Sequence, residues 1–176
     1  MLKFLKVRNV KFPEREDGNA GIDFFIPDYD EDLIVDLKSK NQGLTILKDG
    51  IYLQPSQSVL IPSGIKSHFD PSIALMAVEK SGQATKKRLA VGACLVDSSY
   101  RGEIHLHVYN TGTQPVKLLY GEKLVQFVPF KFSTEELDLR ENCTEEDFYK
   151  EELKTKRGKG GFGSTGTLSE KEEVSK

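Results

Sequence analysis

Between residues 44 and 132, closely spaced turn residues divide the chain into short apolar segments. The segments are rich in β-branched and aliphatic residues, and glycine and proline separate them, as at Asp49-Gly50 and Pro62-Ser63-Gly64. Segments this short, with turns at such regular intervals, are typical of the strands of sandwiches, jelly rolls and barrels. The sequence therefore predicts an all-β domain.

One segment, residues 104–109, shows which face of its strand is buried. Ile104, Leu106 and Val108 fall on one face, and His105, His107 and Tyr109 fall on the other. Two histidines spaced in this way can bind a metal ion, but the sequence provides no evident third ligand. We therefore expect a solvent-facing surface there and not a metal site.

The rest of the chain departs from the strand pattern. Residues 28–42 are acidic and then mixed, and a hairpin, a short helix and a surface insertion all fit them. Residues 133–155 form a connecting segment in which a capping-box-like pair predicts a short helix over 145–153. The Gly-rich and then charged residues 156–176 cannot build a core and are expected to form a flexible arm. The β domain is thus expected over residues 1–132.

Composition and charge exclude several classes of protein. The 176 residues fit one domain and a tail, and a net charge of −2 argues against a dedicated nucleic-acid coat. No apolar run is long enough to cross a bilayer, and the N-terminus lacks a signal-peptide pattern. Cys94 and Cys143 lie far apart, so neither a disulfide framework nor a structural zinc site is expected. We expect a cytoplasmic protein, in the host cytoplasm for a viral or phage gene.

The Gly-rich stretch RGKGGFGSTG, residues 157–166, suits a flap that wraps around phosphate groups. Glycines let backbone N–H groups approach an anion closely. The guanidinium of Arg157 matches phosphate oxygens, and Phe162 can stack on a flat base. A flexible linker has a similar composition, so the stretch alone leaves both interpretations open.

A second candidate is LVDSSYRGE, residues 95–103, in which Asp97 follows an apolar run and precedes a turn. A carboxylate at a strand end can accept a proton from water or hold a sugar hydroxyl. Tyr100 is close enough to line the same pocket. An ordinary Asp-Ser-Ser turn is the alternative.

Three weaker candidates are polar residues next to apolar segments. Lys80, Ser81 and Gly82 form a possible phosphate contact, or an exposed turn. Asp23 could orient metal-bound water or cap a strand. Gln126 points away from its apolar neighbours, either into a site or into solvent.

The order of these segments is more specific than any one of them. The sequence AGIDF, KSG, LVDSSYRGE, GEKLVQF and RGKGGFGSTG resembles the five ordered motifs of the homotrimeric dUTPase family. The resemblance extends from about residue 11 to residue 167. It implies a distorted β jelly roll of the β-clip type, assembled as a homotrimer with swapped C-terminal arms. It also implies hydrolysis of dUTP to dUMP and pyrophosphate with Mg²⁺.

The resemblance assigns the sugar and base contacts by position. Asp97 would bind the deoxyribose 3′-hydroxyl and position or activate the attacking water. Tyr100 would pack under the sugar and exclude a ribose 2′-hydroxyl. A hairpin over residues 89–95, continuing into Val96, would read uracil through backbone groups, including those of Leu95.

The same resemblance assigns the phosphate and metal contacts. Lys80, Ser81 and Gly82 would bind the phosphates, and Gln126 would contact the phosphate and water region. Asp23 would hold the hydration shell of Mg²⁺ indirectly, through water.

The arm completes the site that the resemblance implies. Arg157 would clamp the γ-phosphate and Phe162 would stack on uracil. Gly163 and Ser164 would close over the phosphates of a site on another subunit.

The chain departs from the family pattern in its second motif and in the base-reading hairpin. Glu79 and Lys80 replace a proline and an arginine, which keeps the charge but loses the two-pronged guanidinium. The interval between Ser81 and Asp97 is short and lacks the usual asparagine, and Cys94 stands where glycine is common. Base recognition is therefore where this chain is expected to differ most from the family.

Two alternatives keep the same fold. A dCTP deaminase-like or bifunctional enzyme would need an Arg-Ser-Ser motif and a glutamate near the position that His107 occupies, and the chain has neither. A non-catalytic nucleotide-binding regulator would not need Asp97, Tyr100 and Arg157, which are all present.

Overall fold

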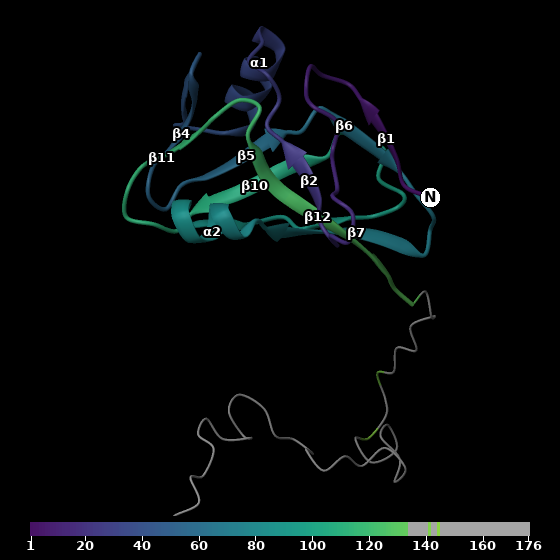
Figure 1. The fold of residues 1–176 in the computed structure, drawn as a ribbon. Coiled ribbons are helices and arrows are strands. Elements are labelled where there is room, and N and C mark those ends of the chain that lie inside the picture. The colour runs from purple at the N-terminus through teal and green to yellow at the C-terminus, as the bar shows by residue number, and fades with distance from the viewer. Residues whose placement is uncertain (134–140, 142–143, 145–176) are drawn as a thin grey trace, which may run out of the picture. The chain divides into compact units, whose positions relative to one another are not determined.

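A computed structural model describes residues 1–133, 141 and 144 (Figure 1). This part of the chain contains twelve strands and two helices, so the predicted all-β domain is confirmed. No helix within it is long and apolar enough to span a membrane. The helix expected over 145–153 and the Gly-rich arm lie outside the described residues.

The strands form four small sheets, and every described pairing is antiparallel. The largest sheet has the order β2 (Ile22–Phe25), β12 (Lys123–Lys131), β7 (Ile73–Glu79) and β9 (Leu95–Val96). A second has the order β5 (Ser58–Pro62), β10 (His105–Asn110) and β8 (Leu89–Val91). A third has the order β11 (Val116–Leu118), β4 (Gly50–Leu53) and β3 (Thr45–Leu47). The last pairs β1 (Lys3–Lys6) with β6 (Ile65–His68).

One hydrophobic core joins residues from all four sheets, as a jelly roll requires. At its centre the rings of Phe24 and Phe127 lie 4.7 Å apart, on the adjacent strands β2 and β12. Each side chain is almost completely buried, and burial of one such ring contributes roughly 2–3 kcal/mol.

The predicted alternation of β10 and the residue before it is confirmed on the core side. Ile104, Leu106 and Val108 are almost completely buried. The other face is only partly open: Tyr109 is exposed, but His105 and His107 are half-buried. The expectation of a solvent-facing surface was therefore wrong for both histidines, because neighbouring backbone and ring groups cover them.

The segment 28–42, for which three structures fitted the sequence, is mainly helical. Helix α1 (Glu31–Lys40) begins after Asp30, whose carboxylate accepts a hydrogen bond from the Leu33 N–H at 2.7 Å. Leu33 and Leu37 are one turn apart and both are fully buried. These residues attach the helix to the β domain, where it packs against β5 (Figure 1).

Helix α2 (Ser81–Lys87) occupies a place where the sequence suggested a turn. Lys80 is its N-cap residue, and Arg88 ends it in the left-handed conformation with φ 55°. Lys86 and Lys87 lie in the last turn, where a positive charge favours the carboxyl end of a helix. The helix leads from β7 into β8, against which it packs (Figure 1).

The hairpin expected over residues 89–95 is not formed. Strand β8 pairs with β10 and strand β9 pairs with β7, so the two strands belong to different sheets. Between them, the N–H of Gly92 donates to the His107 carbonyl and the N–H of Ala93 donates to His107 Nδ1, each at 2.9 Å. These bonds to β10 use the donors that a hairpin would have turned toward its own partner strand.

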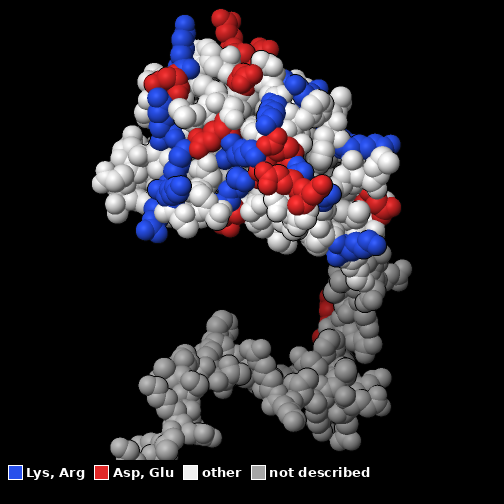
Figure 2. Space-filling view, viewed as in Figure 1, with Lys and Arg blue, Asp and Glu red and all other residues white. Residues whose placement is uncertain are grey.

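Positive and negative side chains are interspersed on the face seen in Figure 2. This distribution agrees with the net charge of −2 and with the expectation that no dedicated nucleic-acid surface is present on that face.

Candidate active site

Three of the predicted site residues meet at the edge between β2 and β12. Gln126 lies directly opposite Asp23 in the strand register. Lys80, at the end of β7, donates to Asp23 Oδ1 with a nitrogen–oxygen distance of 2.5 Å. The amide of Gln126 donates to the carbonyl of Glu79 at 2.8 Å. Motifs far apart in the sequence thus form one charged group.

Lys123 belongs to the same group, although the sequence reasoning missed it. Its ammonium lies 3.1 Å from Asp23 Oδ2 and 2.5 Å from Glu14 Oε1. The strand register shifts between Lys123 and Val125, so Lys123 and Gln126 lie opposite Phe25 and Asp23, two residues apart on β2. Regular alternation would have placed these two side chains on opposite faces, and no sequence signal revealed the bulge.

The ion pairs of this group change the proton affinity of its members. Hydrogen bonds to Glu14 and then Asp23 raise the pKa of Lys123. Hydrogen bonds from Lys11 and then Lys123 lower the pKa of Glu14. Both side chains stay charged near neutral pH, so the group offers fixed charges of both signs to a ligand.

A hollow of about 490 Å³ opens beside this group, which we call the charged hollow. It is lined by Glu14, Glu16, Asn19, Ala20, Gly21, Asp23, Lys80, Lys123, Gln126 and Val128. Gly21 fits here because it lacks a side chain: a Cβ atom would lie 2.1 Å from Gln126 Oε1. Ser81 and Gly82, the next predicted phosphate contacts, are exposed at the start of α2.

The other predicted group forms at the end of β9. Asp97 is exposed, and its carbonyl accepts a hydrogen bond from the Tyr100 N–H at 3.1 Å, which closes a turn. The Tyr100 hydroxyl donates to the Glu103 carbonyl at 2.9 Å. Gly102 leaves room for that hydroxyl, since a Cβ atom there would lie 2.3 Å from it.

This turn borders a hollow of about 180 Å³, which we call the turn hollow. It is lined by Leu60, Ala93, Leu95, Val96, Asp97, Tyr100, Ile104, His105 and Phe127. The predicted sugar and base residues are therefore grouped around one mostly apolar space, which suits a flat base and a sugar. The turn hollow and the charged hollow share no lining residue.

Comparison with known proteins identifies the family of this arrangement. The sequence profile of the dUTPase family matches residues 22–166. The chain belongs to the dUTPase family. It is 34% identical over 125 residues to the deoxyuridine 5′-triphosphate nucleotidohydrolase of Ectopseudomonas mendocina, covering 69% of this chain and 77% of the relative. It is 32% identical to the enzyme of that name from Shewanella piezotolerans, covering 86% and 93%.

Solved structures of dUTPases share the fold. The dUTPase of Staphylococcus bacteriophage 80alpha with dUPNHPP superposes with a TM-score of 0.71 at 18% identity, covering 95% of this chain and 99% of the phage protein. The native dUTPase of EIAV superposes with a TM-score of 0.59 at 22% identity, covering 82% and 99%. The jelly roll expected from the sequence is thus confirmed.

The histidines of β10 lie beside the turn hollow of this dUTPase-family chain. His105 Nδ1 lies 2.9 Å from the Glu103 carbonyl, which makes Nδ1 the protonated nitrogen of a neutral ring. Burial lowers the pKa of His105 and of His107, so both rings favour the neutral form. Among the described residues, no cluster of three metal-ligating side chains is present.

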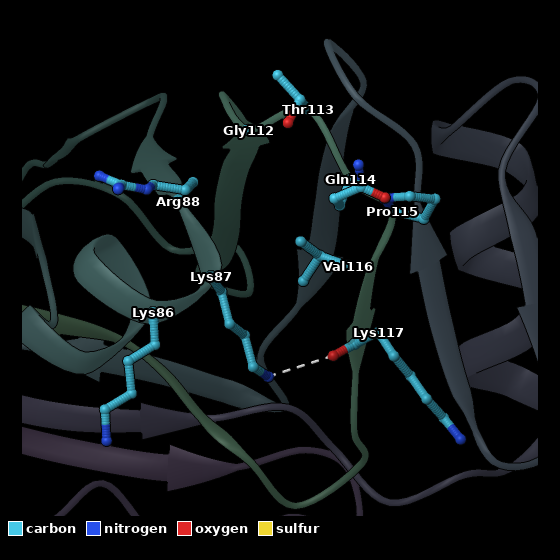
Figure 3. Close-up of a pocket in the computed structure, with 9 residues that line it drawn as sticks. All are labelled: Lys86, Lys87, Arg88, Gly112, Thr113, Gln114, Pro115, Val116 and Lys117. Atoms are coloured by element: carbon cyan, nitrogen blue, oxygen red, sulfur yellow. Dashed lines mark hydrogen bonds between the residues drawn. The ribbon is translucent and has the colours of Figure 1, made fainter.

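A basic hollow of about 360 Å³ lies away from every predicted site residue (Figure 3). It is lined by Lys86, Lys87, Arg88, Gly112, Thr113, Gln114, Pro115, Val116 and Lys117. The Lys87 ammonium is already committed, because it donates to the Lys117 carbonyl at 3.2 Å and to Glu122 Oε1 at 2.5 Å. In Figure 3 the side chains of Lys86, Arg88 and Lys117 point in different directions, so they do not converge on one anion.

Arg157, Phe162, Gly163 and Ser164 of this dUTPase-family member lie outside the described residues. Their assignment to a closing arm stays a prediction of the sequence.

Proposed function

We propose that this chain is a dUTP diphosphatase, which hydrolyses dUTP to dUMP and pyrophosphate. The observation that carries the proposal is the turn hollow, where Asp97 and Tyr100 lie beside an apolar space in a chain of the dUTPase family. Relatives that cover most of the chain bear the name deoxyuridine 5′-triphosphate nucleotidohydrolase.

Asp97 is the catalytic residue of the proposal. Its exposed carboxylate can accept a hydrogen bond from the 3′-hydroxyl of deoxyribose and orient a water molecule toward the α-phosphorus. Tyr100 packs under the sugar, where its fixed hydroxyl leaves no room for a 2′-hydroxyl. Discrimination of this kind depends on the position of one ring, so it is sensitive to small displacements of the turn.

Base recognition is assigned to the backbone around Leu95 and Val96, which line the turn hollow. Backbone donors and acceptors that match uracil meet a donor with a donor when cytosine is bound. A buried mismatch of this kind costs about 1–3 kcal/mol, because a polar group is left without a partner. The connection from β8 to β9 is a crossing between sheets, so the backbone groups available are those of residues 93–96.

The phosphates are assigned to the charged hollow and to the start of α2. Lys80, Ser81, Gly82 and Gln126 provide an ammonium, a hydroxyl, backbone N–H groups and an amide. Lys123 adds a second ammonium beside Asp23, which helps to balance the charge of a triphosphate. Neutralisation of the phosphates is the main electrostatic requirement for phosphoryl transfer.

We infer that the complete site forms between subunits of a homotrimer. In the described residues, the charged hollow and the turn hollow have separate linings, yet one dUTP molecule needs both its base and its phosphates bound. Assembly of subunits would place the turn of one copy beside the charged group of another. Arg157, Phe162, Gly163 and Ser164 would then close the site from a third copy.

Magnesium is the proposed cofactor, and the residues present fit a hydrated ion. Mg²⁺ keeps several waters and usually needs only one or two carboxylates together with substrate phosphates. Asp23 provides such a carboxylate, although both of its oxygens are engaged by Lys80 and Lys123, so it would hold the ion through water. When bound, Mg²⁺ neutralises phosphate oxygens. The dUTPase of phage phi11 coordinates a structural Mg(II) ion.

A substrate panel tests the proposal. We expect pyrophosphate release from dUTP with Mg²⁺, little release from dCTP or UTP, and a lower rate after chelation of the metal. Ammonia release from dCTP would instead support the deaminase alternative. Tight binding of dUTP without product of either kind would support the non-catalytic regulator.

A further inference from the structure

Tyr100 is held from the side of the molecule that faces away from its substrate. Its hydroxyl donates to the carbonyl of Glu103, and the same carbonyl accepts a hydrogen bond from Nδ1 of His105, both at 2.9 Å. Tyr100 and His105 both line the turn hollow. One backbone oxygen therefore fixes the hydroxyl of one lining residue and the ring of another.

The side chain of Glu103 anchors that carbonyl. Oε1 accepts from Arg8 Nε at 2.8 Å and from the backbone N–H of Gly64 at 2.6 Å, and Oε2 accepts from Arg8 Nη2 at 3.1 Å. The two charged side chains are each 14% exposed, so water screens the pair only weakly. A planar guanidinium gripping both oxygens of a carboxylate restrains its orientation as well as its position.

Arg8 is itself fixed from two directions. Its Nη2 also pairs with Asp36, on the inner side of α1. Gly64, with φ 74°, approaches so closely that a Cβ atom there would lie 3.0 Å from the Arg8 Cβ. The Glu103 hydrogen bond, given first, raises the pKa of Arg8, and the charges of Glu103 and Asp36 act in the same direction.

We propose that Arg8 is a positioning residue for the sugar-binding turn and that it acts on Tyr100 through Glu103. This inference rests on the proposed function, because it assigns to Arg8 the accuracy with which Tyr100 separates deoxyribose from ribose. Arg8 touches no part of the substrate. It keeps the Glu103 carbonyl in the place from which the Tyr100 hydroxyl is held.

A simple contribution to folding is the competing explanation, and substrate selectivity separates the two. Partial unfolding lowers the concentration of active enzyme, which reduces turnover of dUTP and UTP by the same factor. Loss of positioning frees the Tyr100 ring and lowers the ratio of kcat/KM for dUTP to that for UTP. The ratio is therefore unaffected by the amount of folded protein.

The experiment is a double-mutant cycle of Arg8→Met and Tyr100→Phe, with Arg8→Lys as the conservative variant. We expect each single change to lower the dUTP-to-UTP ratio about tenfold, and the double variant to lower it little further, because both break one chain of contacts. Arg8→Lys should recover part of the ratio. The same cycle is read by equilibrium binding of non-hydrolysable analogues of dUTP and UTP, which requires no turnover.

Two results would overturn the inference while leaving the proposed function intact. One is an unchanged ratio in Arg8→Met with activity on dUTP retained. The other is full additivity of Arg8→Met and Tyr100→Phe, which would show that the two residues act independently. An unmodified protein that binds the dUTP analogue with no preference over the UTP analogue and releases no pyrophosphate would instead contradict the proposed function.

Discussion

Lys80 donates a hydrogen bond to Asp23 across 2.5 Å, and this contact joins the residue before α2 to strand β2. The sequence assigns the two residues different tasks, phosphate binding and support of hydrated Mg²⁺. The structure shows that without substrate they neutralise each other. A triphosphate that recruits the ammonium of Lys80 would leave Asp23 Oδ1 free to accept hydrogen bonds from metal-bound water.

The first prediction concerns the charge of Lys80. Lys80→Met is expected to raise KM for dUTP and to lower kcat/KM about tenfold, because the loss of one charge-assisted phosphate contact costs about 1.5 kcal/mol. Steady-state kinetics with saturating Mg²⁺ measures it. Lys86→Met, in the last turn of the same helix and outside the charged hollow, is the matched control. Equal losses in the two variants would contradict the assignment.

The second prediction uses the tight contact of Gly21. The Cβ atom of Gly21→Ala would lie 2.1 Å from Gln126 Oε1, so the Gln126 side chain must move. We expect kcat/KM for dUTP to fall by about as much as in Gln126→Ala. In a Gln126→Ala background the same alanine meets only the Cβ at 3.3 Å, and its further effect should be small. A large additional loss there would show that Gly21 matters for another reason.

The sequence predicted the class of the fold and most of the charged group for a physical reason. Short apolar segments between turns have few solutions other than an all-β domain, and the buried residues of β10 follow their alternation. Asp97 and Tyr100 lie in one local turn, so their spacing alone brings them together.

Contacts that depend on register or on tertiary packing could not be predicted. Lys123 enters the charged group through a bulge in β12, which alternation does not reveal. The expected hairpin before Asp97 is a crossing between two sheets, because His107 on β10 binds the donors of the connection. Arg8 meets Glu103 across 95 residues of sequence, and no local pattern marks such a pair.

The third prediction concerns the attachment of α1. Asn41 ends the helix, and its amide donates to the carbonyls of Leu37 and Leu60 while its oxygen accepts from the Leu60 N–H at 2.7 Å. Asn41→Ala should lower the free energy of unfolding by about 2 kcal/mol, since part-buried groups of β5 lose their partners. Urea denaturation measures the change. Gln42→Ala, at the exposed next residue, should be nearly neutral, and an equal effect there would refute the role of Asn41.

The fourth prediction is a loss of stability in mild acid. Burial lowers the pKa of His105 and His107 in the folded chain below the ordinary value of 6.5, so the unfolded chain binds more protons as the pH falls through that value. The free energy of unfolding should therefore decrease as the pH falls below about 6.5, and level off once the folded rings also titrate. Urea denaturation at a series of pH values measures this slope.

Carboxylates are separated from the histidines by their pH range. Burial raises the pKa of Glu122, but hydrogen bonds from Gln83 and Lys87 lower it overall, so its stabilising effect is lost only below the ordinary value of 4.5. His105→Gln should flatten the slope near neutral pH and leave the loss at lower pH unchanged. A slope that persists unchanged in both His105→Gln and His107→Gln would contradict the assignment to these rings.

The central claim is that Asp97 directs water to the α-phosphorus of dUTP. Hydrolysis in ¹⁸O-labelled water with Mg²⁺ tests it most directly, because the labelled oxygen marks the phosphorus that water attacks. We predict that the label appears in dUMP and not in pyrophosphate, and that Asp97→Asn releases product at least about 100-fold more slowly while remaining folded. Label in pyrophosphate, or an Asp97→Asn variant as fast as the unmodified chain, would contradict the claim.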